Sequence, residues 1–256
     1  MHPDIQSQKD HRNIEICKVG VKNIKYPIIV EDRAQKFQNT IAEIDIFVDL
    51  HNEHRGTHMS RFLEVLNKYH KETLIDNLET FLKEIRTQLN SQSAFVNIKF
   101  PYFVEKEAPV SKIKSLIDYN CIFEASLTNE FSLKIGVVVP ITTLCPCSKE
   151  ISDFGAHNQR SYVTIKAIYN TFIWLEELIE IVEKNASCEI YSLLKRPDEK
   201  FVTEKAYNNP MFVEDIVRDI TIILQSDNRI KWFSIESDNI ESIHNHNAYA
   251  LISSDQ

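Results

Sequence analysis

The segment from residue 140 to residue 161 gathers more chemically capable side chains than any other part of the chain. Its sequence, PITTLCPCSKEISDFGAHNQRS, contains Cys145, Cys147 and, ten residues after the second cysteine, His157. A thiolate and an imidazole can together bind Zn²⁺ or a similar divalent ion. No second Cys/Cys or Cys/His pair at short spacing completes a four-ligand structural zinc site. The pattern therefore favours a catalytic metal with further ligands from distant residues, and an ordinary loop with two free thiols is the alternative.

Two distant polar segments could supply those further ligands. Residues 195–207, KRPDEKFVTEKAY, are expected to form a polar connection between helices and contain three carboxylates, Asp198, Glu199 and Glu204. Residues 241–247, ESIHNHN, contain His244 and His246. Alternate residues of an extended segment share a face, so both imidazoles could reach one site. A solvated loop is the alternative for each segment.

A third polar segment, HNEHRGTHMSR at 51–61, holds three histidines and two arginines. It lies between a predicted strand and the start of a predicted helix, where backbone amides and basic groups can bind phosphate. A simple polar connection capped by Ser60 explains the segment equally well.

Hydrophobic periodicity predicts the elements that position these segments. Alternation indicates strands at 41–50, 95–104, 118–127, 131–141, 161–169, 230–237 and 247–254. Helical spacing indicates two helices within 60–90, one at 171–184 and one from Pro210 to about residue 226. Each half of the chain thus has the order ββααββ, an α+β pattern in which an antiparallel sheet carries a helical pair on one face. We expect an N-terminal tail at 1–20 and modules at 21–128 and 129–256, packed as one unit because no linker separates them.

Composition narrows the classes of function. Four glycines in 256 residues exclude a glycine-rich phosphate loop. The net charge of −8 argues against nucleic-acid binding, although a local basic cluster could still hold a small polyanion. Five cysteines and a polar N-terminus without an apolar run predict reduced thiols in a cytoplasmic protein. No stretch approaches the roughly 20 apolar residues of a membrane span.

Five segments in family order, spanning about residues 47–250, resemble the signature blocks of the type IB GTP cyclohydrolases. They are RGTHMSRF, LCPCSKEIS-x-x-GAHNQRS, KRPDEKFVTEKAY, NPMFVEDIVRDI and ESIHNHNAYA. The resemblance implies a tunnelling fold with two ββααββ modules per chain and a homo-oligomer, expected to be a tetramer, with sites between subunits. It implies a hydrolase that acts on a cyclic amidine and converts GTP and water to 7,8-dihydroneopterin triphosphate and formate, the first step of folate-type pterin synthesis.

Carried over to this chain, the resemblance implies a Zn²⁺, Mn²⁺ or Fe²⁺ site formed by Cys145, His157, Glu199 and His244. Opening the imidazole ring requires water to add at C8, and a bound metal makes water a nucleophile at neutral pH. His246 is the better candidate for moving protons to N7 and N9, since His157 is a proposed ligand. Cys147 is either a neighbour of the ligand thiolate or a small buried residue. Asn247 departs from the family pattern, in which Asp is expected.

Recognition of the guanine base is expected at Glu214. Apolar positions define a buried stripe on its helix and leave Glu214 near the N-terminal turn, where the helix dipole favours a carboxylate; they are Val213, Ile216, Val217, Ile220 and Leu224. A carboxylate accepts both N1–H and the 2-amino group of guanine. An exposed ion pair with Arg218 is the alternative. The candidates for binding the triphosphate are basic residues in polar segments, namely Arg55, Arg61, Lys149, Arg160, Lys195 and Arg196.

Three other functions compete with this one. An archaeal-type relative releases a cyclic-phosphate dihydroneopterin from the same ring-opening site. A non-catalytic protein of the same fold could bind a purine or pterin, although all four proposed metal ligands are present here. A relative that reduces a nitrile uses a lone cysteine nucleophile and no metal ligands, which fits this sequence less well.

Overall fold

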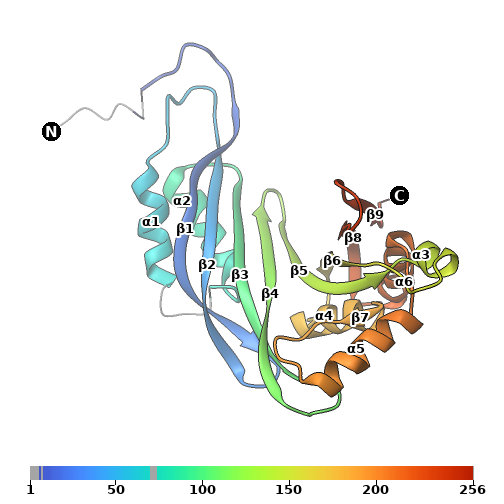
Figure 1. The fold of residues 1–256 in the computed structure, drawn as a ribbon. Coiled ribbons are helices and arrows are strands. Elements are labelled where there is room, and N and C mark those ends of the chain that lie inside the picture. Colours follow the sequence, from blue (N-terminus) through green and yellow to red (C-terminus); the bar gives the residue numbers. More distant parts are fainter. Residues whose placement is uncertain (1–5, 7, 70–73, 256) are drawn as a thin grey trace. The chain divides into compact units, whose positions relative to one another are not determined.

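A computed structural model describes residues 6, 8–69 and 74–255 of the chain. The chain divides into two compact units, Met1–Pro101 with Ile122–Lys134, and Tyr102–Cys121 with Ile135–Gln256 (Figure 1). The described residues contain nine strands, which form one sheet in the order β1-β2-β3-β4-β5-β6-β8-β9, with β7 paired to β5. The α+β prediction is confirmed. Among the described residues, no helix combines the length and apolar character needed to cross a membrane.

The first unit has the predicted ββααββ order, but its first strand, Ile16–Asp32, is not among the strands that hydrophobic alternation indicates. Its elements are β1 (Ile16–Asp32), β2 (Lys36–Leu50), α1 (Met59–Leu66), the short 3-10 helix η1 (Asn67–Tyr69), α2 (Leu78–Leu89), and parts of β3 (Ala94–Glu107) and β4 (Lys114–Leu127). Alternation along β2 buries Ile44, Ile46 and Val48, as predicted. The two predicted helices of the range 60–90 correspond to α1, which begins one residue before that range, and α2; residues 70–73 fall outside the described residues. Because β1 begins at Ile16, the last five residues of the predicted tail are strand.

The second unit contains more elements than its sequence pattern suggests. Besides the remaining parts of β3 and β4, they are most of β5 (Phe131–Leu144), α3 (Pro146–Ile151), β6 (Asn158–Tyr169), α4 (Leu175–Lys184), β7 (Cys188–Glu189), α5 (Arg196–Asn208), α6 (Val213–Ser226), β8 (Ile230–Ile240) and β9 (Ala248–Ser253). Taken without α3, β7 and α5, they repeat the order ββααββ. The buried residues of α6 are those of the predicted stripe. This helix begins at Val213, three residues later than predicted.

The prediction of a polar connection at 195–207 is wrong, because these residues form α5. Only Asp198 and Ala206 of this helix are buried, so its sequence carries no apolar stripe that would reveal it. The helix is stabilised at its first turn instead. The Asp198 carboxylate accepts hydrogen bonds from the backbone N–H of Lys195, Val110 and Ser111, each at 2.8 Å, and from the Ser111 hydroxyl at 2.6 Å.

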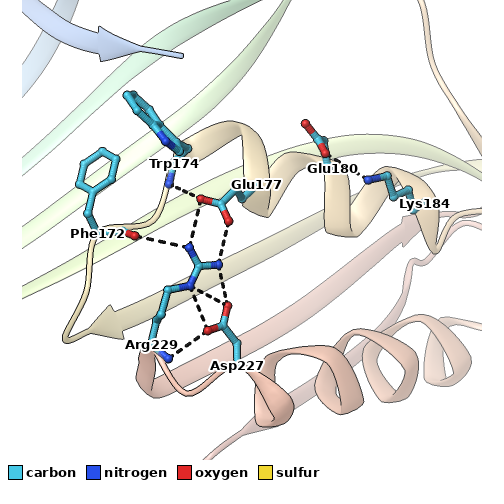
Figure 2. A network of polar contacts seen from close by, with 7 residues as sticks. All are labelled: Phe172, Trp174, Glu177, Glu180, Lys184, Asp227 and Arg229. Carbon is cyan, nitrogen blue, oxygen red and sulfur yellow. Dashed lines mark hydrogen bonds and ion pairs between the residues drawn. The ribbon is translucent and has the colours of Figure 1, made fainter.

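An ion-pair network fastens α4 to the turn between α6 and β8 (Figure 2). Arg229 Nη2 lies 2.7 Å from Glu177 Oε2 and 2.8 Å from Asp227 Oδ2. Glu177 also accepts a hydrogen bond at 3.0 Å from the backbone N–H of Trp174, just before α4. One guanidinium thus joins the start of α4 to the end of α6 within the second unit.

Candidate active site

The ends of β5 and β6 hold Cys145 and His157 opposite each other. Leu144 pairs with Asn158 across the two strands, and the backbone N–H of Cys145 donates to the carbonyl of His157 at 3.2 Å. Ser148 closes the segment between them. Its hydroxyl donates to the Cys145 carbonyl and accepts from the His157 backbone N–H, both at 3.2 Å. The predicted polar loop therefore contains an ordered helix, α3, whose first residue is a proline.

One cavity of about 280 Å³ in the second unit brings several predicted site residues together. Cys145, His157, Glu214, His244 and His246 all line it. The rest of its wall is formed by residues that the sequence did not single out, which are Gln159, Met211, Phe212, Asn239, Glu241 and Ala248, and by Val213 of the α6 stripe. The residues that line the cavity belong to β6, α6 and β8 and to the segments that flank these elements.

The two histidines after β8 stack on each other. The ring centroids of His244 and His246 lie 5.0 Å apart, with 16° between the ring planes. Both side chains are exposed. They lie in the turn between β8 and β9 and not on a regular strand, but the expectation that they reach one site agrees with their shared cavity.

Glu241 is a carboxylate that sequence reasoning missed. Its Oε2 lies 4.0 Å from Nδ1 of His157, and both side chains are mostly buried, at 11% and 17% exposure. The Nδ1 atom of His157 is itself buried and has no hydrogen-bond partner among the described residues. The available signal was the position of Glu241 at the start of the segment that carries His244 and His246.

A buried polar network supports the floor of the cavity. Asn239 Oδ1 accepts from the Ser237 hydroxyl at 3.0 Å, and its Nδ2 lies 3.5 Å from Thr143 Oγ1. Thr143 and Ser161 share a hydrogen bond of 2.7 Å. These groups are engaged with one another, so they hold the ends of β5, β6 and β8 in register.

Glu214 is the second residue of α6, on the rim of the cavity. The backbone N–H of Phe212 is occupied by Asp215 Oδ2 at 2.9 Å. Arg218 faces Asp215 at 3.9 Å, and no ion pair between Arg218 and Glu214 occurs in the described part of the chain. The alternative interpretation of Glu214 as half of a helix-surface ion pair therefore finds no support in this geometry.

Other predicted site residues of the second unit do not line this cavity. Glu199 is exposed on α5, and Lys195 and Arg196 are exposed at the start of that helix. Lys149 Nζ donates to the Tyr207 carbonyl at 2.6 Å and lies 4.4 Å from the centre of its ring. The predicted roles of these residues stay predictions.

Arg160 lines a separate cavity of about 210 Å³, together with Cys188 and Tyr191 among others. Burial raises the pKa of Cys188 to about 12, so this thiol stays protonated at neutral pH. Arg160 and Gln159 are neighbours on β6, and successive strand residues point to opposite faces.

Two arginines of the predicted phosphate segment belong to the first unit. Arg55 Nη1 donates to Gln8 Oε1 at 3.0 Å, and Arg61 Nη1 donates to the Gln88 carbonyl at 2.9 Å. Their predicted contact with triphosphate stays a prediction.

Cys147 is exposed on α3 and lies outside the cavity lining, so its interpretation as a small buried residue is wrong. Asn247, which stands where Asp was expected, donates to Asp238 Oδ1 at 2.9 Å. The amide thus supports the turn that carries the two stacked histidines.

The donors in the cavity are chemically suited to a divalent ion, but they do not surround a single point. No three Cys, His, Asp or Glu side chains among the described residues converge closely enough to hold a metal. The same cavity is nevertheless lined by sulfur, nitrogen and oxygen donors, from Cys145, His157, His244 and Glu241.

Comparison with known proteins identifies the family. The family model for type I GTP cyclohydrolase folE2 matches residues 2–250. The chain belongs to the type I GTP cyclohydrolase folE2 family. The GTP cyclohydrolase FolE2 of Citrifermentans bemidjiense is 55% identical over 249 residues, which are 97% of this chain and 93% of the relative. The FolE2 of Thermosipho africanus is 53% identical over 253 residues, 98% of both chains.

Solved structures confirm the tunnelling fold of this FolE2 family member. A hyperthermostable mutant of Bacillus sp. TB-90 urate oxidase superposes with a TM-score of 0.55 at 10% identity, covering 93% of this chain and 99% of that chain. The same urate oxidase without chloride gives a TM-score of 0.53 at 8% identity, with the same coverage. At such low identity the likeness concerns the fold alone.

Proposed function

We propose that this protein is a GTP cyclohydrolase, which uses water to open the imidazole ring of the guanine base of GTP. The products are 7,8-dihydroneopterin triphosphate and formate, and the pterin leads toward folate. The observation that carries this proposal is the family match over residues 2–250, combined with one cavity that contains Cys145, His157 and Glu214. A non-catalytic binding protein would not require the thiolate and imidazole to share a cavity with the base-binding carboxylate.

Glu214 orients the substrate. Its carboxylate has no protein partner recorded among the described residues and accepts hydrogen bonds from N1–H and the 2-amino group of guanine in parallel. Adenine lacks this pair of donors, so the same contact excludes ATP. Phe212 and Met211, which line the cavity beside Glu214, provide an apolar surface for the flat base and exclude water from it.

A divalent ion such as Zn²⁺ or Mn²⁺ is part of this proposal. Cys145, His157 and His244 would hold it together with a carboxylate, and the buried, unpartnered Nδ1 of His157 supports that role. The resemblance implies Glu199 as the carboxylate, while Glu241 is the carboxylate that lines the cavity with the other three. When bound, the ion supplies the Lewis acidity that makes water nucleophilic at neutral pH.

His246 moves the protons. Ring opening leaves N7 and N9 in need of protons, and an imidazole has one nitrogen that can donate a proton and one that can accept it. Its stacking on His244 holds the His246 ring at the mouth of the cavity. Because His246 is not one of the proposed ligands, its nitrogens are available for this exchange.

The proposal also includes the residues that bind the triphosphate and the assembly of several chains. Lys149, Arg160, Lys195, Arg55 and Arg61 are the candidate phosphate partners. A homo-oligomer, expected to be a tetramer, would bring residues of neighbouring chains to each site. What supports this arrangement is that Glu199 and Lys195 do not line the cavity of their own chain.

Incubation of metal-free protein with GTP, with and without Mn²⁺ or Zn²⁺, tests the function. We expect metal-dependent release of formate and a pterin that fluoresces after oxidation, with the triphosphate retained. Release of pyrophosphate with a cyclic-phosphate pterin would assign the protein to the archaeal-type reaction instead. Absence of formate with every metal would overturn the proposal. Metal content of Glu199→Gln and Glu241→Gln, measured side by side, identifies the carboxylate ligand.

A further inference from the structure

Gln159 has a buried polar side chain to which neither the sequence motifs nor the proposed mechanism assigns a role. It is only 8% exposed, it lines the cavity, and its Oε1 has no hydrogen-bond partner among the described residues. Its backbone pairs with Thr143 in the regular ladder between β5 and β6. The side chain is therefore directed to the cavity side of the sheet by the register of β6, on the face opposite Arg160.

A buried acceptor without a partner is unfavourable, so native proteins usually satisfy such a group with a protein donor, an ordered water or a ligand. Two of the neighbouring polar groups are already engaged. The Asn239 side chain is hydrogen-bonded to Ser237 and Thr143, and the backbone N–H of Phe212 donates to the Asp215 carboxylate. Of the two carboxamide side chains that line the cavity in the described residues, Gln159 is the one whose oxygen retains no partner.

The hydrogen-bond donors of the guanine base match this leftover acceptor. In GTP the base carries three N–H groups, one on N1 and two on the 2-amino group. A carboxylate that binds in parallel takes N1–H and one amino N–H, which leaves a single amino N–H. The terminal torsion of glutamine is broad, so a small rotation turns the carbonyl of Gln159 toward that group.

We propose that Gln159 accepts a hydrogen bond from the second N–H of the guanine 2-amino group and so makes the site distinguish guanine from hypoxanthine. This inference rests on the proposed GTP cyclohydrolase function and on Glu214 as the first base contact. The amide nitrogen of the same carboxamide then faces N3 of the base, which is an acceptor, so one side chain satisfies both atoms of that edge.

Kinetics with GTP and with ITP, which lacks the 2-amino group, test the proposal in the metal-loaded enzyme. The variants are Gln159→Met, which keeps the length of the side chain without its polar atoms, and Gln159→Glu, which keeps an acceptor. For each protein we would measure kcat and KM for GTP and the inhibition constant of ITP against GTP. We expect Gln159→Met to raise KM for GTP about tenfold while the inhibition constant of ITP changes less than about threefold. Gln159→Glu should retain most of the preference for GTP over ITP.

An equal loss for GTP and ITP in Gln159→Met would overturn the inference, because it would assign Gln159 a purely structural role. Unchanged constants for both nucleotides would overturn it as well. If Gln159→Met turns over no GTP, the dissociation constants of the two nucleotides replace KM and the inhibition constant, with the same expectations. Failure of the proposed function would be seen separately, as absence of GTP turnover in the wild-type protein.

Discussion

Two cysteines that are only two residues apart in sequence have different surroundings in the structure. Cys145 caps α3, with its Sγ 3.4 Å from the backbone N–H of Ser148, and lines the cavity. Cys147 is exposed and does not line the cavity. At the scale of single residues, one backbone turn therefore gives the two thiols different surroundings.

The first prediction compares these two thiols. Cys145→Ala should abolish GTP turnover and remove bound metal, because thiolate is the softest donor in the proposed ligand set. Cys147→Ala should leave turnover and metal content close to the wild-type values. Formate release and metal analysis of the purified variants provide the check. Equal losses in the two variants would show that the ligand assignment is wrong.

The second prediction concerns base recognition by Glu214. Glu214→Ala should lower kcat/KM for GTP by at least about 100-fold, because guanine loses a pair of charge-assisted hydrogen bonds in a partly desolvated cavity. Metal content and the thermal unfolding midpoint should stay normal. Asp219→Ala, which removes an exposed acid from the same helix outside the cavity, is the matched control. Near-normal GTP turnover by Glu214→Ala would place Glu214 on the helix surface.

At the scale of elements, the Asp198 carboxylate anchors α5, a helix with little buried apolar surface. Burial alone would raise the pKa of Asp198, but hydrogen bonds from Ser111, Lys195 and Val110 hold it well below its usual value. Since α5 buries only Asp198 and Ala206, this contact with the β3–β4 connection is a main anchor of the helix.

The third prediction follows from that lowered pKa. A carboxyl group whose pKa is depressed in the folded state stabilises the fold above its ordinary pKa, and this contribution is lost as the pH falls through the folded-state value. Asp198→Asn should therefore lower the thermal unfolding midpoint at neutral pH. The difference from wild type should shrink as the pH falls below the ordinary carboxyl value of 3.8. Glu204→Gln, an exposed change on α5, should have little effect at any pH. A difference for Asp198→Asn that grows in acid would contradict the argument.

The fourth prediction concerns the ion-pair network of α4 (Figure 2). The hydrogen bond from Arg229 holds the pKa of Asp227 below its usual value, and the same guanidinium binds Glu177. Arg229→Ala should cost about 1 kcal/mol of unfolding free energy, because the side chain is 35% exposed and the network is partly screened by solvent. Lys184→Ala breaks only the exposed pair with Glu180 on the same helix and should cost less than half as much. Denaturant unfolding of both variants measures the contrast, and equal costs would show that the network adds nothing to a simple surface pair.

At the scale of the whole molecule, the order of strands leaves β9 with a free edge. Within the described residues β9 pairs with β8 alone, and its Tyr249 and Leu251 are exposed. Unpaired strand edges with apolar side chains are sites where further chains associate. This supports, from within the second unit, the proposed assembly of several copies.

The fifth prediction is the mass of the active enzyme. Light scattering of an active sample should give a multiple of the 29.8 kDa chain mass, with about four chains expected. Dilution into the range where the assembly dissociates should reduce turnover, because each site would lose residues of a neighbouring chain. Full activity in a sample of 29.8 kDa would exclude intersubunit sites.

The sequence alone was enough to predict the repeated ββααββ order and the family. Strand alternation and the apolar stripe of α6 are local properties, because burial of one face imposes a period on the residues that form it. The blocks that carry Cys145, His157, Glu214 and the stacked histidines were likewise recognisable from residue type and order.

Only the tertiary structure decided which polar residues share a cavity. Gln159 and Arg160 are adjacent in sequence, yet the alternation of β6 directs them to different cavities. Glu241 joins His157 because the ends of β8 and β6 lie side by side in the sheet. α5 is a helix although its sequence has no apolar stripe; besides the nearby N–H of Lys195, its Asp198 binds residues 110 and 111, far away in the chain. Such contacts join residues distant in sequence, and no local pattern of residue types records them.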